Sequence, residues 1–294
     1  MTGNKQGTPI EVMKELLPDP IAKIKLEDFL MGHLKTFLED VSLENFPLES
    51  PNLDKDAFLA RLESYEEKTD ILQQLITLLA KWGKSPEQLY LLQQILVRIS
   101  EANQKVAGVI GWAKFQWYPL QLLMYSAGIG ALATKNFAAL KIILDTPVRR
   151  DETPNETHPL SIVVGSKVSE MGDWFKQLPG LEAKKYPRSE HLFVVLQPIL
   201  ENILYLSGNY EELFDEFEVL QALSFANFRG GGWGPQGRFS WKHQRYDAGP
   251  FLRMVEEGRV EGKNWGPIKA GMFKGSSEDF LKTAEEFKER LTSW

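Results

Sequence analysis

Apolar side chains recur three and four positions apart along most of this 294-residue chain, between residues that typically start and stop helices. Asp54 precedes one such stripe, which ends just before Gly83. Ser85 opens the next stripe, with Gln88 placed to complete a capping box. The pattern predicts an all-α fold of about ten helices in antiparallel pairs, a helical-repeat-like array with one Gly/Trp-rich irregular excursion. Helix starts are expected at Asp19, Asp54, Ser85, Asn136, Ser189, Asn209 and Ser276.

The segment of residues 112–144 carries three lysines as its only charged residues, so we expect it to cross the centre of the core. Gly128 and Gly130 lie within it, although glycine costs about 1 kcal/mol in a helix relative to alanine. Close approach of a neighbouring helix would explain both glycines. A ligand pocket at this position is the less favoured interpretation.

Residues 145–158 combine two prolines with mixed charge and form the best internal boundary. They divide the chain into an N-terminal helical part, 1–150, and a C-terminal helical part, 151–294, unless the two form one continuous domain. The apolar run of residues 160–164 fits a strand or a helix. Residues 229–249 are expected to form an irregular, Gly-rich loop.

Composition excludes several classes of protein. With 43% hydrophobic residues the chain is not disordered, and without cysteine it has neither disulfides nor thiolate metal ligands. It contains no run of 18 apolar residues and begins without the apolar stretch of a secretory signal. We therefore expect a cytoplasmic protein that does not insert into a membrane.

Motifs for catalysis are not found. The four histidines are far apart in the sequence, and no Gly-x-Ser-x-Gly elbow occurs. Five carboxylates near residue 215 fit the solvated side of a helix, or an acidic contact face for a basic partner; they are Glu211, Glu212, Asp215, Glu216 and Glu218. We expect a non-catalytic protein with no cofactor and no metal.

The unusual stretch is residues 228–246, which carries a charge of +4 although the chain as a whole carries −6. Gly232, Gly234 and Gly237 satisfy Gly-x-Gly-x-x-Gly, but a helix precedes them where a dinucleotide site needs a strand. Three interpretations remain: a structural loop with aromatic side chains in the core, a protein interface, or a nucleotide or nucleic-acid contact. The candidate binding residues are Arg229, Trp233, Arg238, Trp241, Lys242, His243 and Arg245.

Two helix junctions in the sequence are alike. Residues 132–140 and 205–213 each place an asparagine before an aromatic residue, with leucine three positions further on. These junctions resemble the helical hairpins of tetratricopeptide repeats, although no 34-residue period runs through the chain. The resemblance implies hairpin geometry and, by analogy, the binding of peptides or partner domains.

A wider resemblance concerns the order of several short motifs. An early Asp-Pro helix is followed by Trp-Tyr-Pro-Leu, by Leu-Phe-Asp-Glu-Phe-Glu, and by Trp-Gly-Pro-Ile-Lys near the end. This order is similar to that in helical C-terminal regions of large prokaryotic multidomain proteins, including defence proteins. The resemblance implies a sensing or assembly role and supplies no catalytic residue.

We therefore expect a non-catalytic helical interaction or sensing module of a larger bacterial assembly, with anti-phage defence as one such context. Its partner would be another protein or domain, and the oligomeric state stays open. The alternative is an anionic-ligand or nucleic-acid binder that uses residues 228–246. Replacing Arg238 and Arg245 with alanine is expected to abolish binding and to leave folding nearly intact.

Overall fold

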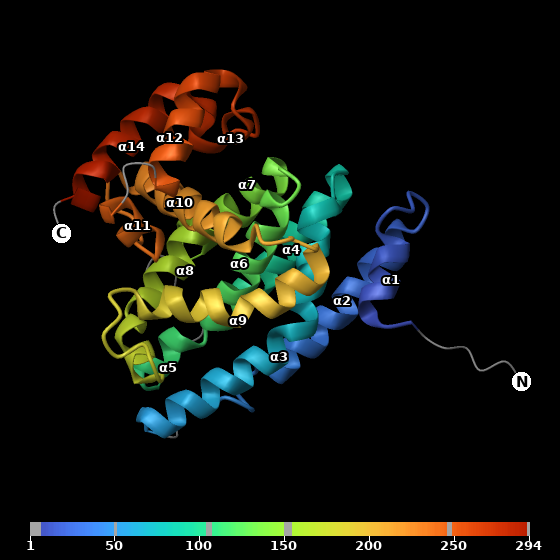
Figure 1. The fold of residues 1–294 in the computed structure, drawn as a ribbon. Coiled ribbons are helices and arrows are strands. Elements are labelled where there is room, and N and C mark those ends of the chain that lie inside the picture. The colour runs from blue at the N-terminus through green and yellow to red at the C-terminus, as the bar shows by residue number, and fades with distance from the viewer. Residues whose placement is uncertain (1–6, 50–51, 104–107, 150–154, 246–248, 293–294) are drawn as a thin grey trace, which may run out of the picture.

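The computed structural model describes residues 7–49, 52–103, 108–149, 155–245 and 249–292. Within these ranges the chain forms fourteen α-helices and a single hairpin of two short strands, so the predicted all-α class is confirmed (Figure 1). The α-helices are α1 (Pro9–Leu16), α2 (Lys23–Asp40), α3 (Lys55–Trp82), α4 (Pro86–Ala102), α5 (Ile110–Phe115), α6 (Tyr118–Leu132), α7 (Phe137–Asp145), α8 (Leu160–Ser169), α9 (Pro187–Leu204), α10 (Tyr210–Arg229), α11 (Phe239–Arg245), α12 (Pro250–Glu261), α13 (Gly266–Lys269) and α14 (Ser277–Thr292). The strands are β1 (Pro147–Arg149) and β2 (Thr157–Pro159), and the 3₁₀ helices are η1 (Gly172–Gln177), η2 (Gly262–Asn264) and η3 (Met272–Gly275).

Side-chain caps start several helices where the sequence predicts them. The Asp54 carboxylate accepts a hydrogen bond from the Ala57 N–H at 2.9 Å, ahead of α3. The Ser85 hydroxyl accepts from the Gln88 N–H at 3.2 Å, which completes the predicted capping box of α4. Each cap satisfies a backbone donor that has no partner within the helix, so these two predictions are confirmed.

Two predicted helix starts are wrong. The Asp19 carboxylate accepts from the Ile21 N–H at 2.8 Å, which stabilises a turn, and α2 begins only at Lys23. Helix α9 begins at Pro187, so Ser189 lies within its first turn. The Ser189 hydroxyl bonds a distant side chain and does not cap the helix.

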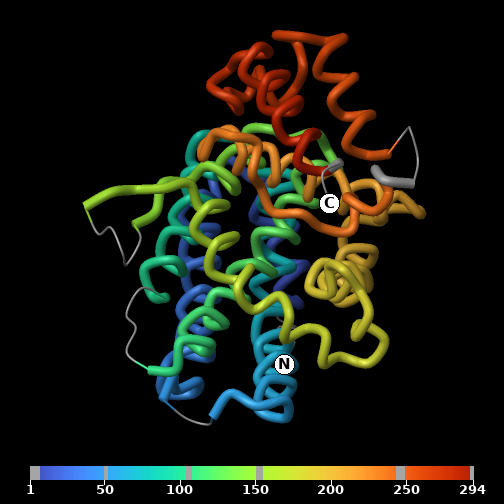
Figure 2. Tube along the Cα trace, turned by 90° about the vertical axis from the view of Figure 1, so that its left-hand side faces the viewer, coloured from blue at the N-terminus to red at the C-terminus, as the bar shows by residue number. Residues whose placement is uncertain are grey.

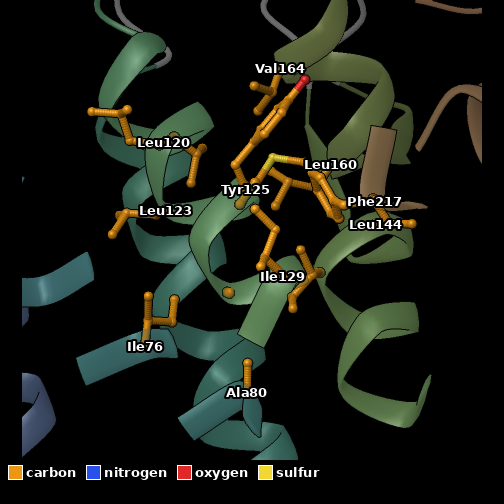
Figure 3. Packing of buried hydrophobic residues seen from close by; sticks show 14 of the residues in the cluster. Ile76, Ala80, Leu120, Leu123, Tyr125, Ile129, Leu144, Leu160, Val164 and Phe217 are labelled. Carbon is orange, nitrogen blue, oxygen red and sulfur yellow. The ribbon is translucent and has the colours of Figure 1, made fainter. Parts of the chain in front are cut away.

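Helix α6 is the centre of the core, and every one of its residues is buried. It packs against α3 on one side and against α7, α8, α9 and α10 on the others. Figure 3 shows Tyr125 and Ile129 of α6 between Ile76 of α3 and Phe217 of α10. The predicted central position of residues 112–144 is confirmed for this helix.

The glycines of α6 allow neighbouring helices to approach closely. A Cβ added at Gly128 would overlap the ring of Phe217, and one added at Gly130 would lie 2.8 Å from the Thr77 carbonyl oxygen. Side chains at these positions would push α10 and α3 away from α6. The prediction that helix packing explains both glycines is confirmed.

The predicted boundary region contains the β1–β2 hairpin, in which Val148 pairs with His158 in antiparallel register. The hairpin lies at the side of the bundle (Figure 2). The apolar run of residues 160–164 is helical and forms the first half of α8. Buried residues from both sides of the hairpin contribute to the same hydrophobic core.

The two junctions that resemble tetratricopeptide hairpins join α6 to α7 and α9 to α10. Asn136 accepts from the Ala139 N–H at 3.4 Å and donates to the carbonyl oxygens of Ala80 and Gly83 at 2.8 Å each. Asn209 occupies the equivalent cap position of α10, but its side chain makes no capping hydrogen bond. Asn136 thus ties its turn to the end of α3.

Helices α12, α13 and α14 form a layer at one end of the molecule (Figures 1 and 2). Helix α10 lies beneath this layer and contacts α12 and α14 in addition to α6 and α9. Because several helices cover α10, three of its polar side chains are buried: Asp215, Glu218 and Gln221.

Candidate functional site

The glycine-rich stretch leads from α10 back across the same helix. Gly230, Gly231 and Gly232 all have positive φ angles, of 72°, 73° and 68°, which turn the chain sharply. A Cβ at Gly234 would lie 2.5 Å from the carbonyl oxygen of Ala222 in α10. Residues 239–245 then form α11, so the irregular segment expected over 229–249 is interrupted by a helix. Phe239, the first residue of α11, is buried. Packing of this side chain stabilises the short helix, and the local sequence pattern gives no sign of that packing.

Arg238 and Lys242, two of the candidate binding residues, face acidic groups of α10. The Arg238 guanidinium donates to Glu211 at 3.0 Å and lies 3.5 Å from the ring centroid of Phe193. The Lys242 ammonium pairs with Glu211 at 2.6 Å and also with Asp215. Arg238 is buried, so we now expect its replacement by alanine to destabilise the fold, in contrast to the expectation from the sequence.

The other candidate residues are placed differently. Arg229 is exposed at the end of α10, and its guanidinium lies 6.0 Å from the ring centroid of Phe225. Trp233 is exposed, with its ring centroid 5.1 Å from that of Phe225. Trp241 is half-buried, 5.6 Å from the Lys242 ammonium. The side chains of His243 and Arg245 lie outside the part of the chain that the structure describes.

Glu218 is the centre of a buried polar cluster beneath the glycine-rich stretch. Its carboxylate accepts hydrogen bonds from the Tyr125 hydroxyl at 3.1 Å and from the Ser189 hydroxyl at 2.7 Å. The Ser189 oxygen in turn accepts from the Arg238 backbone N–H at 2.9 Å. Burial, together with the negative charge of Asp215, raises the pKa of Glu218 to about 7.

The interpretation of the α10 carboxylates as a solvated face is therefore wrong for two of them. Asp215 and Glu218 are both buried, because α10 packs against α6 and α9 and is covered by α11. Burial likewise raises the pKa of Asp215, although the ammonium of Lys242 opposes this effect. Arg238 and Lys242 supply cations beside Asp215, which accounts for two of the four basic residues of 228–246.

A second polar group extends the cluster toward α3. Glu66 accepts from the Tyr118 hydroxyl at 2.7 Å and lies 2.6 Å from the Nε2 atom of His191. The Arg188 guanidinium interacts electrostatically with the side chains of Tyr118 and Glu218, which links the two groups. These residues are not apparent from the sequence, because a single sequence carries no signal that pairs Glu66 with a histidine 125 positions away. The connected groups hold α3, α6, α9 and α10 in one register.

A separate surface feature lies between the first turns of α2 and α4. A groove of about 900 Å³ is lined there by Ile24, Trp82 and Tyr90, among others. These side chains are 75%, 52% and 61% exposed, respectively, although each is large and apolar or aromatic. Lys23 of α2 and Glu87 of α4 also line the groove, and they form an ion pair of 2.6 Å. We call this feature the α2–α4 groove.

Comparisons with known protein families, with curated proteins and with solved structures found no match for this chain. Among the described residues, no group of three or more histidine, aspartate or glutamate side chains is placed to hold a metal ion. The helices of the described ranges are also all too short or too polar to cross a membrane.

Proposed function

We propose that this chain is a non-catalytic helical interaction module that serves a larger assembly by docking a protein partner in the α2–α4 groove. The observation that carries the proposal is the joint exposure of Trp82, Tyr90 and Ile24 around one groove. Clusters of large apolar side chains on a surface are typical of protein interfaces, whereas single exposed apolar side chains are common on any protein. Tryptophan and tyrosine are the side chains that most often anchor such interfaces.

The lining of the groove combines exposed and buried side chains of two helices. Its walls come from two helices, α2 and α4, which pack against each other along the bundle. Its floor contains Leu26 and Leu91, both buried. A partner that inserts apolar side chains between the two helices would cover this floor and shield Trp82 from water. A bacterial assembly, with anti-phage defence as one such context, remains the setting that we propose.

The experiment is co-purification of the tagged full chain from its native cells, compared with the double variant Trp82→Ala/Tyr90→Ala. The control is Val194→Ala on α9, because Val194 is 66% exposed and does not line the groove. We expect a discrete partner to elute with the wild-type chain and the control, and to be lost from the double variant at unchanged helical content. Equal recovery with all three chains would contradict the proposal.

The alternative function is the binding of nucleic acid or an anionic ligand by residues 228–246. One observation favours it: Arg229 and Trp233 are both exposed at the start of this segment, and both lie beside the ring of Phe225. An arginine beside an exposed aromatic ring is a common arrangement for contacting phosphates and bases. Arg238 and Lys242 have acidic partners within the chain, so they contribute less to this alternative than the sequence suggests.

A further inference from the structure

A small pocket adjoins the α2–α4 groove. It has a volume of about 330 Å³ and lies between α1 and the end of α3, where α1 packs against α2 and α3 at the edge of the bundle (Figure 1). Its lining residues are Met13, Lys14, Leu17, Pro18, Leu78 and Trp82. The last residues of α1 and the ring of Trp82 belong to both linings, so the pocket and the groove are neighbours on one surface. We call the smaller feature the α1–α3 pocket.

The interior of the α1–α3 pocket is apolar. Met13, Leu17 and Leu78 are buried, with at most 6% of their surface exposed. Sites for small ligands have volumes of about 300–1,000 Å³, and this pocket lies at the lower end of that range. The pocket therefore has room for a single residue with an apolar side chain.

One cation lies in this apolar lining. Among the residues that the structure describes, Lys14 is the one charged side chain that lines the pocket. Its ammonium lies 5.7 Å from the ring centroid of Tyr205, and within the described ranges no ion pair joins it to an acid. The charge of Glu11 acts on Lys14, but the Glu11 carboxylate already accepts hydrogen bonds from the N–H and the hydroxyl of Thr8, at 2.7 and 3.0 Å. Lys14 is thus available to a carboxylate from outside the chain.

A second lysine lies close to Lys14. Lys81 is buried beside Trp82, and its ammonium donates to the carbonyl oxygen of Leu204 at 3.3 Å. Burial, and then the positive charge of Lys14, lower the pKa of Lys81. A carboxylate beside Lys14 would offset the repulsion between the two ammonium groups. Lys81 also borders a cleft with four acids, none of which pairs with it in the described part of the chain: Glu212, Glu216, Glu257 and Glu261.

An apolar interior with a single cation matches the chemistry of a C-terminal residue. Such a residue carries an apolar side chain and a free carboxylate on the same Cα, so both groups can reach one small pocket. An aspartate or glutamate within a chain places its carboxylate on a different residue from the apolar side chain. The residues that precede a chain end would lie in the adjoining groove, whose volume is about 900 Å³.

We propose that the α1–α3 pocket binds the C-terminal residue of the partner polypeptide, with an apolar side chain against Met13 and Leu78 and the α-carboxylate beside Lys14. The preceding residues of the partner would continue along the α2–α4 groove. The inference rests on the proposed docking in that groove, and it specifies which part of the partner is bound.

The test uses four acetylated hexapeptides, titrated into the full chain by calorimetry. The first is Ser-Ala-Leu-Ser-Ala-Leu with a free C-terminal carboxylate, and the second is the same peptide as a C-terminal amide. The third is a free acid with serine in place of the last leucine, and the fourth is an amide with aspartate in place of the last alanine. We expect saturable binding of the first peptide at concentrations up to about 1 mM, and about fivefold weaker binding of each of the others.

Three results would overturn the proposal. One is absence of binding of the first peptide, and another is equal binding of its amide. Equal binding of the aspartyl amide would show that a side-chain carboxylate suffices and that no chain end is needed. Octanoate is a further probe, because it carries a carboxylate and an apolar chain without a polypeptide; we expect it to bind more weakly than the first peptide, and equal or tighter binding would assign the pocket to free acids.

Lys14→Gln tests the position of the carboxylate. It should reduce the preference for the free acid over the amide from about fivefold to less than about twofold, with unchanged affinity for the amide. Because Lys14 is exposed, the melting temperature should stay that of the wild type. Lys184→Gln removes the same charge at an exposed position outside both linings and should keep the preference. Equal loss of the preference in both variants would show non-specific attraction and would overturn the proposal.

Failure of groove docking and failure of this inference give different results. If Trp82→Ala/Tyr90→Ala loses the partner but the wild type shows no preference for the free acid, groove docking is supported and the chain-end assignment is overturned. If the preference is present and depends on Lys14 but every chain recovers the partner equally, the pocket is supported and docking in the groove is contradicted.

Discussion

Gly237 packs directly against the carboxylate of Glu218. A Cβ at residue 237 would overlap that carboxylate, which already accepts hydrogen bonds from Tyr125 and Ser189. The glycine thus closes the polar cluster from the side of the glycine-rich stretch. The Gly-x-Gly-x-x-Gly spacing in this chain therefore has a packing explanation, since Gly232 and Gly234 approach the backbone of α14 and α10 in the same way.

Gly237→Ala should destabilise the chain by about 1–3 kcal/mol, because an added methyl group has no space beside a buried carboxylate. Gly32→Ala is the control, since a Cβ there meets nothing within 4 Å and Gly32 lies inside α2. That control should stabilise the chain by about 0.5–1 kcal/mol. Urea unfolding measures both free energies, and similar values for the two variants would refute the packing explanation.

The stability of the chain should fall as the pH rises toward neutrality. The pKa of Glu218 is raised from the ordinary 4.5 to about 7 in the folded chain, so its protonated form is favoured by folding. Its contribution is complete below about 4.5 and is lost as the pH rises through about 7. The groups that face the carboxylate are Tyr125, Ser189, Arg188, Asp215 and Arg238.

Glu218→Gln tests this dependence, because the amide keeps an acceptor for Tyr125 and Ser189 without titrating. Between pH 5 and pH 7.5 the wild type should lose about 2 kcal/mol more unfolding free energy than the variant. Glu63→Gln, at an exposed position of α3, should follow the wild type. Parallel pH profiles for the wild type and Glu218→Gln would show that Glu218 does not titrate in this range.

Lys242→Met should destabilise the chain by about 2 kcal/mol, because it leaves Asp215 buried without its closest cation. A buried ion pair that is broken completely costs about 3–5 kcal/mol of unfolding free energy. The loss should be smaller here, because the Arg238 guanidinium remains 3.9 Å from Asp215. Lys23→Met removes the exposed pair with Glu87 and should cost at most about 1 kcal/mol. Thermal unfolding compares the two, and equal losses would mean that the Lys242 pair behaves as a surface pair.

The salt dependence of binding distinguishes protein docking in the α2–α4 groove from nucleic-acid binding by residues 228–246. Affinity for a single-stranded oligonucleotide would fall by about 0.4 log units per contacted phosphate between about 50 and about 200 mM salt. A partner anchored on Ile24, Trp82 and Tyr90 in the α2–α4 groove should lose less over this range, since these contacts are apolar or aromatic. Oligonucleotide binding that falls with salt and is lost in Arg229→Ala/Trp233→Ala would favour the alternative.

Much of the fold follows from local sequence signals. Asp54 and Ser85 are short polar residues that satisfy helix-start donors next to them in the chain, and Gly128 and Gly130 mark close packing within an apolar segment. Such signals need only neighbouring residues or composition, so a single sequence carries them. The fold class and the central position of α6 could therefore be predicted.

The polar cluster could not be predicted, because its bonds join distant residues. Glu218 meets Tyr125 across 93 positions and Ser189 across 29, and the α10 sequence alone gives no sign that α11 covers its acidic side. The basic residues of 228–246 were apparent from composition, but their partners on α10 depend on how the glycines turn the chain. Composition alone does not distinguish a cation that is paired within the chain from one that is available to bind a ligand.

Site-specific crosslinking tests the central claim most directly. Because the chain has no cysteine, Glu27→Cys introduces a single attachment point for a thiol-reactive photocrosslinker at an exposed position of the α2–α4 groove and leaves Trp82 and Tyr90 in place, and Val194→Cys provides one at an exposed position on α9. In native extract we expect one discrete crosslinked protein from position 27 and none from position 194. The same crosslinked species from both positions, or none from either, would contradict partner docking in the groove.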